Sequence, residues 1–304
     1  MPKPTAKPRV TFDPTELAKF GGLGLVARSV VEGFLSGVHR SPFNGFSMEF
    51  AEHRQYYPGD EIRRIDWRAF GKTDRYYIKE YEDETNLKAV LVVDASGSMN
   101  YAGRNKLSKF VFAQRVAASL AYLLLGQLDG VGLLTHDTQP REYIPPKASR
   151  KQLFRILQRL EDTKPGGETS LGSVWDRIAG QYLKRRGLVV LISDGLDTSP
   201  NLARSLRHLR HARHDVLFLQ ILTPEEIEFP FANPTKFQSL ELRTHELTVD
   251  ARRWREEYLK NFAEHQRSLS RMANELHFDH LLLRIDEPVD RALGAYLATR
   301  RRKR

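Results

Sequence analysis

Lys88-Ala-Val-Leu-Val-Val-Asp94-Ala-Ser96-Gly-Ser98-Met99 is the stretch on which the interpretation of this 304-residue chain rests. Its first half is a short apolar run rich in valine, which is typical of a strand that is buried on both faces of a parallel sheet. Polar residues begin abruptly at Asp94, where that strand would end. Because ligands of open α/β sheets bind at the carboxyl ends of the strands, the stretch predicts a binding site at this edge.

The polar residues of this stretch indicate a metal site. Asp94, Ser96 and Ser98 alternate along the chain, which places one carboxylate and two hydroxyl groups around a common point. Oxygen donors of this kind suit a hard cation such as Mg²⁺, with Mn²⁺ and Ca²⁺ as the other candidates. The alternative is structural, because Asp often caps the helix that follows a strand and Asp and Ser are common in such turns.

The Asp94-x-Ser96-x-Ser98 motif resembles the metal-ion-dependent adhesion site of von Willebrand factor A domains. In that family a Thr and a second Asp, from two later loops, complete the site. Thr169 and Asp194 match these two residues in order and spacing. The resemblance therefore implies a five-residue metal site, formed by Asp94, Ser96, Ser98, Thr169 and Asp194.

Strand and helix patterns alternate after this motif. Apolar runs predict strands at residues 129–135, 188–193, 216–222 and 278–285. Amphipathic patterns predict helices at residues 106–125, 150–160, 170–183, 200–213, 251–276 and 290–299. A turn at Pro140 predicts an antiparallel edge strand at 141–144, and 237–247 is expected to form a short hairpin or edge element. The alternation predicts an α/β fold with a doubly wound, mostly parallel, Rossmann-like sheet that has one antiparallel edge strand. The resemblance of the motif implies that this sheet is von Willebrand A-like.

The chain is expected to divide into four parts: a disordered tail at 1–12, a small N-terminal α+β segment at 13–86, the α/β domain with a C-terminal extension at 87–299, and a basic tail at 300–304. In the second part, Asp13-Pro14 predicts the start of a helix. The glycines at 21–24 are expected to break it, and residues 25–35 to form a second helix. Short strands are expected on either side of the Pro58-Gly59-Asp60 turn.

The segment from His39 to Trp67, followed directly by the Asp-x-Ser-x-Ser strand, resembles the bacterial domain-of-unknown-function-58 family. In that family a small segment precedes a von Willebrand A-type domain, and the resemblance covers the chain from about residue 15 to residue 300. It implies a protein that works beside a MoxR-type AAA+ ATPase as an adaptor in assembling or remodelling other complexes. Many relatives carry membrane helices at their amino end, which this sequence lacks.

Composition excludes several classes of protein. With no cysteine, the chain has no disulfides, thiolate nucleophiles, or Cys-ligated zinc or iron–sulfur sites. No apolar run approaches the eighteen or more residues of a membrane helix, and Met1–Arg9 is not a signal peptide, so we expect a cytoplasmic protein without a membrane span. The net charge of +10 permits contact with nucleic acid or anionic lipid.

The sequence does not indicate an enzyme. Asp94-x-Ser96 is similar to the start of haloacid-dehalogenase phosphatases, but those enzymes have an acidic residue in the place of Ser96, and an ordinary hydroxyl cannot act as that general acid. We expect a non-enzymatic interaction protein, in which a partner's Glu or Asp fills an open position on the metal. The alternative is a nucleic-acid or anionic-surface binder that uses the basic residues at 252–255 and 300–304, although no nucleic-acid-binding module is present. A metal-dependent hydrolase is the third class.

Overall fold

The computed structural model describes residues 17, 21–37, 49–55, 71, 76–82, 87–105, 107–167, 171–197, 200–241 and 246–291. The chain forms two compact units: Phe43–Leu87, and Met1–Pro42 together with Lys88–Arg304. In the smaller unit, strands β1 (Glu49–Gln55) and β2 (Tyr77–Glu82) pair antiparallel. The predicted turn at residues 58–60 lies outside the described residues.

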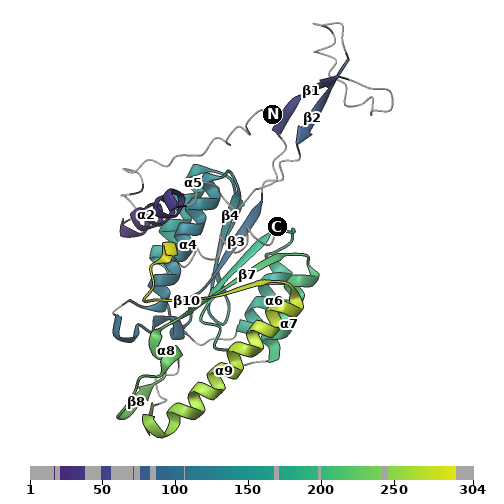
Figure 1. Ribbon diagram of the computed structural model, residues 1–304. Helices are drawn as coiled ribbons and strands as arrows, with labels where there is room; N and C mark the ends of the chain where they lie inside the picture. Colours follow the sequence, from purple (N-terminus) through teal and green to yellow (C-terminus); the bar gives the residue numbers. More distant parts are fainter. Residues whose placement is uncertain are drawn as a thin grey trace. The chain divides into compact units, whose positions relative to one another are not determined.

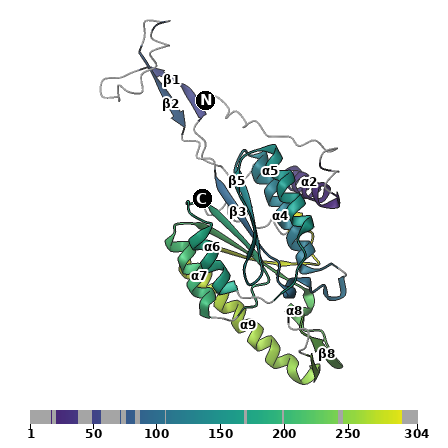
Figure 2. The ribbon, with the colours of Figure 1, turned by 180° about the vertical axis from the view of Figure 1, so that it is seen from behind.

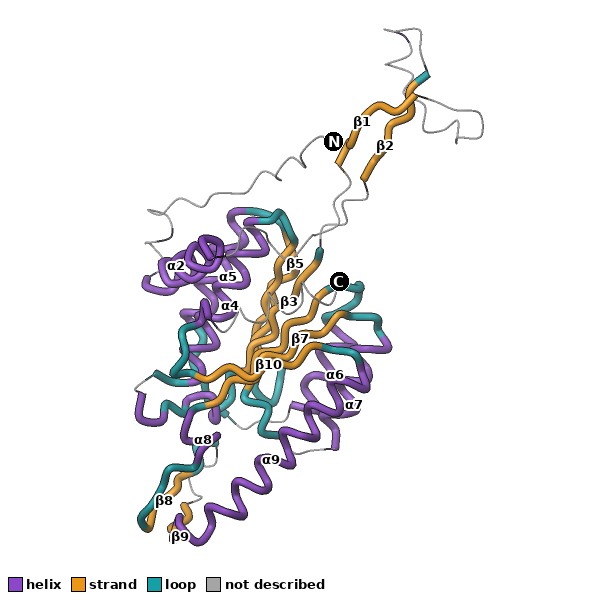
Figure 3. Tube along the Cα trace, viewed as in Figure 1, coloured by secondary structure: helices purple, strands orange, loops and turns teal. Residues whose placement is uncertain are grey.

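A six-stranded sheet forms the centre of the larger unit, with strand order β10-β7-β6-β3-β4-β5 (Figures 1 and 3). Its strands are β3 (Lys88–Asp94), β4 (Gly130–His136), β5 (Pro140–Lys147), β6 (Leu188–Ser193), β7 (Asp215–Leu222) and β10 (Asp279–Arg284). Every neighbouring pair is parallel except β4 and β5, which are antiparallel. The sheet confirms the predicted α/β class, including the single antiparallel edge strand.

Helices cover both faces of this sheet, as the two opposite views show (Figures 1 and 2). On one face lie α2 (Gly21–Gly37), α4 (Lys109–Gly126) and α5 (Arg150–Asp162). On the other face lie α6 (Leu171–Gln181), α7 (Pro200–His211) and α9 (Ala251–Leu276). The predicted helix at 290–299 falls almost wholly outside the described residues.

Among the described helices, α4 alone is long and apolar enough to cross a membrane by length and composition. It lies between the sheet and α2, and 72% of it is buried inside the protein. A core helix passes the same test, so α4 is explained by its packing. The helix begins at Lys109, later than the sequence pattern predicted, because the Ser108 side chain accepts a hydrogen bond from the Val111 amide and caps it.

The glycines at 21–24 do not break a helix, contrary to the prediction. Helix α2 begins at Gly21 and continues through them to Gly37. A Cβ atom at Gly24 would lie 2.7 Å from the backbone oxygen of Leu17, so glycine at this position permits close contact between two parts of the chain. α2 packs against α4 and α5, which makes this helix part of the larger unit.

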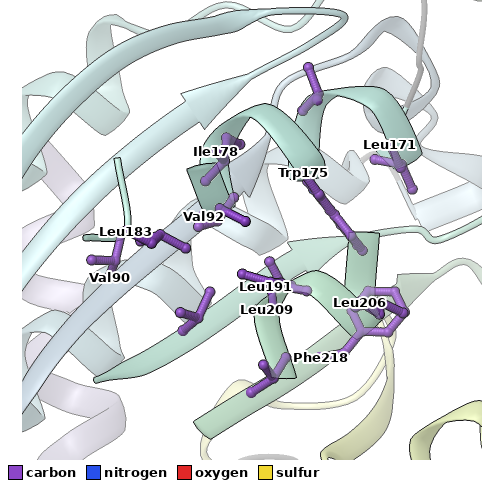
Figure 4. Close-up of a cluster of buried hydrophobic side chains, with 14 of the residues drawn as sticks. Val90, Val92, Leu171, Trp175, Ile178, Leu183, Leu191, Leu206, Leu209 and Phe218 are labelled. Carbon is purple, nitrogen blue, oxygen red and sulfur yellow. The ribbon is translucent and has the colours of Figure 1, made fainter. Parts of the chain in front are cut away.

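Among the described residues, Trp175 on α6 is the largest fully buried side chain, and it lies within the apolar cluster between the sheet and α6 and α7 (Figure 4). Its ring packs edge-on against Phe218, with 5.6 Å between the ring centroids. A buried indole N–H needs an acceptor, and this one donates to Nε2 of His136 at 3.1 Å. His136 therefore carries its proton on Nδ1, which donates to the backbone oxygen of Asp137.

The connection between β7 and β10 is longer than a plain crossover helix. It contains α8 (Pro224–Glu228), the antiparallel strands β8 (Pro234–Gln238) and β9 (Glu246–Asp250), and α9. These strands confirm the predicted hairpin and form a small sheet of their own. Helix α9 begins after Asp250, whose side chain accepts a hydrogen bond from the Arg252 amide.

Acid should destabilise the fold partly through His280. Its ring stacks on Phe218 and its Nε2 donates to Gln220, while burial and the nearby His265 lower its pKa from 6.5 to about 4. A lowered pKa means that the unfolded chain takes up the proton first, so stability is lost as pH falls from 6.5 towards 4. We expect this loss to reach about 3 kcal/mol at the acid end.

The measurement is urea unfolding at a series of pH values between 7 and 4, for wild type and for His280→Gln. The variant keeps a donor for Gln220 but cannot take up a proton, so its stability should fall less over this range. Equal falls in the two proteins would show that His280 does not contribute.

Candidate functional site

The two acidic residues of the predicted site lie at the carboxyl ends of neighbouring parallel strands. Asp94 is the last residue of β3, and Asp194 directly follows β6. In the pairing of these two strands, Val93 lies opposite Ile192. In the sheet, β3 lies between β4 and β6. The chain passes from β3 to β4 on one side, and the later strands β6 and β7 lie on the other side, so the strand order reverses at β3. A crevice forms at such a point in an open α/β sheet. Both aspartates are fully buried.

Asp94 is held by hydrogen bonds on both of its carboxylate oxygens. Oδ1 accepts from the Ser96 amide at 2.9 Å, and Oδ2 accepts from the Ser193 hydroxyl at 2.7 Å. Burial raises the pKa of Asp94, and the neighbouring charge of Asp194 acts in the same direction, although the hydrogen bonds from the Ser193 hydroxyl and the Ser96 amide oppose them. This carboxylate is therefore ionised only at a cost in free energy, which a nearby cation would offset.

The two serines of the motif lie beside these carboxylates. The hydroxyl oxygens of Ser96 and Ser98 are 3.2 Å apart, and the Ser98 side chain also hydrogen-bonds the Asp194 carboxylate. Four of the five predicted residues are therefore brought together. The fifth, Thr169, lies outside the described residues, although its loop reaches the site at Gly167, whose backbone oxygen accepts from the Gly97 amide at 2.8 Å.

Glycine is required between the two serines. A Cβ atom at Gly97 would lie 2.5 Å from the backbone oxygen of Leu240 and 2.9 Å from that of Gly167. Both contacts are with backbone atoms, which cannot move aside as a flexible side chain would. The motif is thus packed against two other segments, one of which belongs to the connection between β7 and β10.

Lys109 is part of the site, and the sequence analysis missed it. Its Nζ donates to Oδ2 of Asp194 at 2.8 Å and to Oε1 of Glu226 at 2.5 Å, and its side chain is only 1% exposed. Burial alone would lower the lysine pKa, but the two carboxylates outweigh it and raise the pKa. Burial would likewise raise the pKa of Asp194, yet Lys109 holds it below its usual range.

One local signal could have pointed to Lys109. It occupies the first helical position of the apolar helix α4, where the helix dipole disfavours a positive charge. A lysine in that place needs a carboxylate from elsewhere. Nothing in the sequence identifies those carboxylates, because Asp194 and Glu226 lie 85 and 117 residues further along the chain.

The partners of Lys109 are themselves fixed. Glu226 forms a capping box at the start of α8, in which its Oε2 accepts from the Thr223 amide at 2.8 Å. The loop after Asp194 is anchored by His265 of α9, whose Nε2 donates to the backbone oxygen of Gly195 at 2.7 Å. The candidate site therefore depends on α8 and α9 as well as on the sheet.

The donor set fits a hard divalent cation held mainly by hydroxyl groups, water and two carboxylates. Among the described residues, no three or more Asp, Glu or His side chains are grouped so that they could hold a metal. No Lys or Arg of the described residues forms an ion pair with Asp94. His136 is neutral in this arrangement, because its Nε2 accepts the hydrogen bond from the Trp175 N–H. Carboxylate and hydroxyl oxygens are donors that Mg²⁺ accepts.

Replacing Lys109 by methionine should destabilise the protein by about 3–5 kcal/mol, because the buried carboxylate of Asp194 and the partly buried one of Glu226 then lose their cation. Urea unfolding in EDTA measures this. Adding Asp194→Asn to Lys109→Met should recover part of the loss, since it removes one of the unpaired charges. A surface ion pair contributes about 1 kcal/mol or less, so a loss of stability below that value would contradict the conclusion that the Lys109 ion pair is buried.

Similar folds occur among solved structures. The conserved hypothetical protein BatB from Bacteroides thetaiotaomicron has a TM-score of 0.45 and 12% identity, over 72% of this chain and 100% of that chain. A von Willebrand factor type A protein from Catenulispora acidiphila has a TM-score of 0.40 and 14% identity, over 72% of this chain and 43% of that chain. These scores are low, so the fold class rests on the sheet topology.

Sequence comparison gives closer relatives. An uncharacterized protein of Mycobacterium tuberculosis is 28% identical over 294 residues, which are 95% of this chain and 91% of that protein. An uncharacterized protein of Mycobacterium avium is 32% identical over 163 residues, which are 52% of this chain and 94% of that protein. The family model "Protein of unknown function DUF58" matches residues 52–268, well over half of the sequence. The chain thus belongs to the DUF58 family.

Proposed function

We propose that this protein is a non-enzymatic interaction protein that binds a divalent cation, and that this cation is Mg²⁺. The observation that supports this most strongly is the charge balance at the strand ends. Asp94 and Asp194 are neighbouring, fully buried carboxylates, and among the described residues the one ammonium group bound to Asp194, that of Lys109, is shared with Glu226. The proposed ligands, direct or through water, are Asp94, Ser96, Ser98, Thr169 and Asp194.

When bound, the metal supplies a positive charge with an open coordination position, which a Glu or Asp of a partner protein can fill. The chain's own residues prepare that position. The hydrogen bonds from Ser193 and from the Ser96 amide fix the orientation of the Asp94 carboxylate. Lys109 keeps Asp194 ionised, because it lowers the pKa of that carboxylate.

The contacts of His136 favour binding over catalysis. It is the titratable base nearest to Asp94, but its Nε2 accepts from Trp175 and its Nδ1 donates to Asp137. Neither nitrogen is left to remove a proton from the hydroxyl of Ser96 or Ser98. A nucleophilic serine needs a base within hydrogen-bonding distance, and the carboxylate that Ser98 contacts, Asp194, is made a weaker base by Lys109, which lowers its pKa.

The partner that we propose is a MoxR-type AAA+ ATPase, beside which the protein would act as an adaptor in the assembly or remodelling of other complexes. Membership of the DUF58 family supports this choice, together with the resemblance of the Asp94-x-Ser96-x-Ser98 motif to a metal-dependent adhesion site. A carboxylate on the ATPase or on its substrate protein would complete the metal's coordination.

Mg²⁺ should stabilise the wild-type protein but not Asp94→Asn. A ligand that binds only the folded state raises stability by mass action, by about 2.7 kcal/mol at a concentration 100 times its Kd. Thermal unfolding with EDTA, Mg²⁺ or Mn²⁺ measures the effect. Asp162→Asn, which changes an exposed carboxylate at the end of α5, is the matched control and should respond as wild type does.

Two results would contradict the metal site in the free protein. One is the absence of any shift in wild type with either ion. The other is an equal shift in wild type and Asp94→Asn, which would place the ion elsewhere. Circular dichroism of Asp94→Asn in EDTA checks that the sheet still folds.

Purification of the tagged protein from a native lysate of cells that carry its gene should recover a MoxR-type AAA+ ATPase in Mg²⁺. The recovery should fall strongly in EDTA and in Asp94→Asn, because both remove the metal bridge. Mass spectrometry identifies the recovered proteins. If wild type in Mg²⁺ recovers no AAA+ ATPase, the proposed partner is wrong, and the thermal shifts still decide whether the metal site exists.

A further inference from the structure

A cavity of about 590 Å³ lies beside the candidate metal site. Its walls come from α8, the β8–β9 hairpin and the first half of α9, which lie together at one end of the larger unit (Figures 1 and 3). Three residues of the site region also line it, namely Ser98, Lys109 and Leu196. A molecule in this cavity would therefore lie next to the proposed metal position.

Stacked aromatic rings form one wall of the cavity. The centroid of Phe229 lies 4.4 Å from that of Tyr258, 5.1 Å from that of Phe231 and 5.9 Å from that of Phe237. The hydroxyl of Tyr258 donates to the backbone oxygen of Glu226 at 2.8 Å, which ties this wall to the partner of Lys109. Because these rings are packed against one another, an apolar group that enters the cavity meets a preformed wall.

Exposed apolar side chains gather around the same cavity. The described part of the chain has eight large hydrophobic residues that are exposed, and four of them line it. These four are Leu196, Leu240, Leu247 and Trp254, of which Leu247 is 63% and Trp254 is 57% exposed. Apolar residues that cluster on a surface mark an interaction site, whereas single ones are ordinary.

The charges that line the cavity are mostly negative, although the whole chain has a net charge of +10. Four glutamates line it, Glu225, Glu226, Glu241 and Glu257. The one cation among the lining residues, Lys109, is already bound to Asp194 and Glu226. Such a surface repels phosphate groups and attracts Lys or Arg. The charge therefore favours a protein segment over a nucleic acid.

We propose that this cavity binds a short segment of a partner protein through a large apolar side chain that is flanked by Lys or Arg. A Glu or Asp within a few residues of that side chain, in the same segment, reaches the metal. This last contact rests on the proposed function, whereas the apolar and basic contacts do not. The partner is thus recognised by three neighbouring features: an acid, a large apolar side chain and a base.

The test uses the full-length protein and a phage-displayed library of random twelve-residue peptides, selected in Mg²⁺. We expect the selected peptides to share an acidic, a large apolar and a basic residue. Fluorescence polarisation of the best peptide should show binding at least about tenfold weaker for Leu247→Asp. Leu247 is mostly exposed, so this variant should fold normally. Leu25→Asp, at an exposed apolar position on α2, is the matched control and should bind as wild type does.

Asp94→Asn separates the two parts of the proposal. A second peptide, in which the acidic residue is replaced by alanine, is measured alongside the selected one. If Asp94→Asn weakens binding of the selected peptide but not of the second peptide, both the metal contact and the cavity are supported. If Asp94→Asn has no effect but Leu247→Asp does, the cavity is supported and the metal contact is wrong.

Three results would overturn the cavity as a peptide site. They are the failure to select any peptide, a set of selected peptides without a shared apolar residue, and equal affinities for wild type and Leu247→Asp. A single-stranded DNA oligonucleotide serves as the competing ligand. If it binds wild type and loses affinity in Trp254→Ala, the surface recognises nucleic acid and the proposal is wrong.

Discussion

A buried ammonium group joins three segments of the chain at the candidate site. The Nζ atom of Lys109 joins the start of α4 to the loop after β6 and to α8, through Asp194 and Glu226. A buried charge that loses its partner is costly, so none of these three segments can leave the others without exposing a charge or admitting water. The loops of the candidate site and the wall of the adjoining cavity are therefore positioned by the same ion pairs.

The fold itself does not require acidic residues at this edge. The core beneath it consists of apolar side chains from β3, β6 and the flanking helices, as Figure 4 shows around Trp175. Placing Asp94 and Asp194 side by side above that core has a cost, which is expressed in the raised pKa of Asp94. Strongly perturbed groups in a crevice are more often found where a protein binds or reacts than where it merely packs.

The parts of the structure that were predicted from sequence are those with a local signal. The strand at residues 188–193 and the helix at 251–276 match the structure, because an uninterrupted apolar run and a capped amphipathic pattern each define their own ends. The serines and Asp94 were found because they are neighbours in sequence. Lys109 was missed because its partners are distant, and the glycines at 21–24 were misinterpreted because the packing of α2 against α4 and α5 offsets their low helix propensity.

The connection between β7 and β10 has a consequence for how such proteins can be diversified. Parallel neighbours always need a crossover that leaves the sheet and returns to it, and here that crossover contains the hairpin and α9. Among the described strands, β8 and β9 pair only with each other, so the six-stranded sheet does not fix the length of this hairpin. A hairpin of another length or sequence is therefore compatible with the same sheet, provided that its backbone keeps the close approach of Leu240 to Gly97.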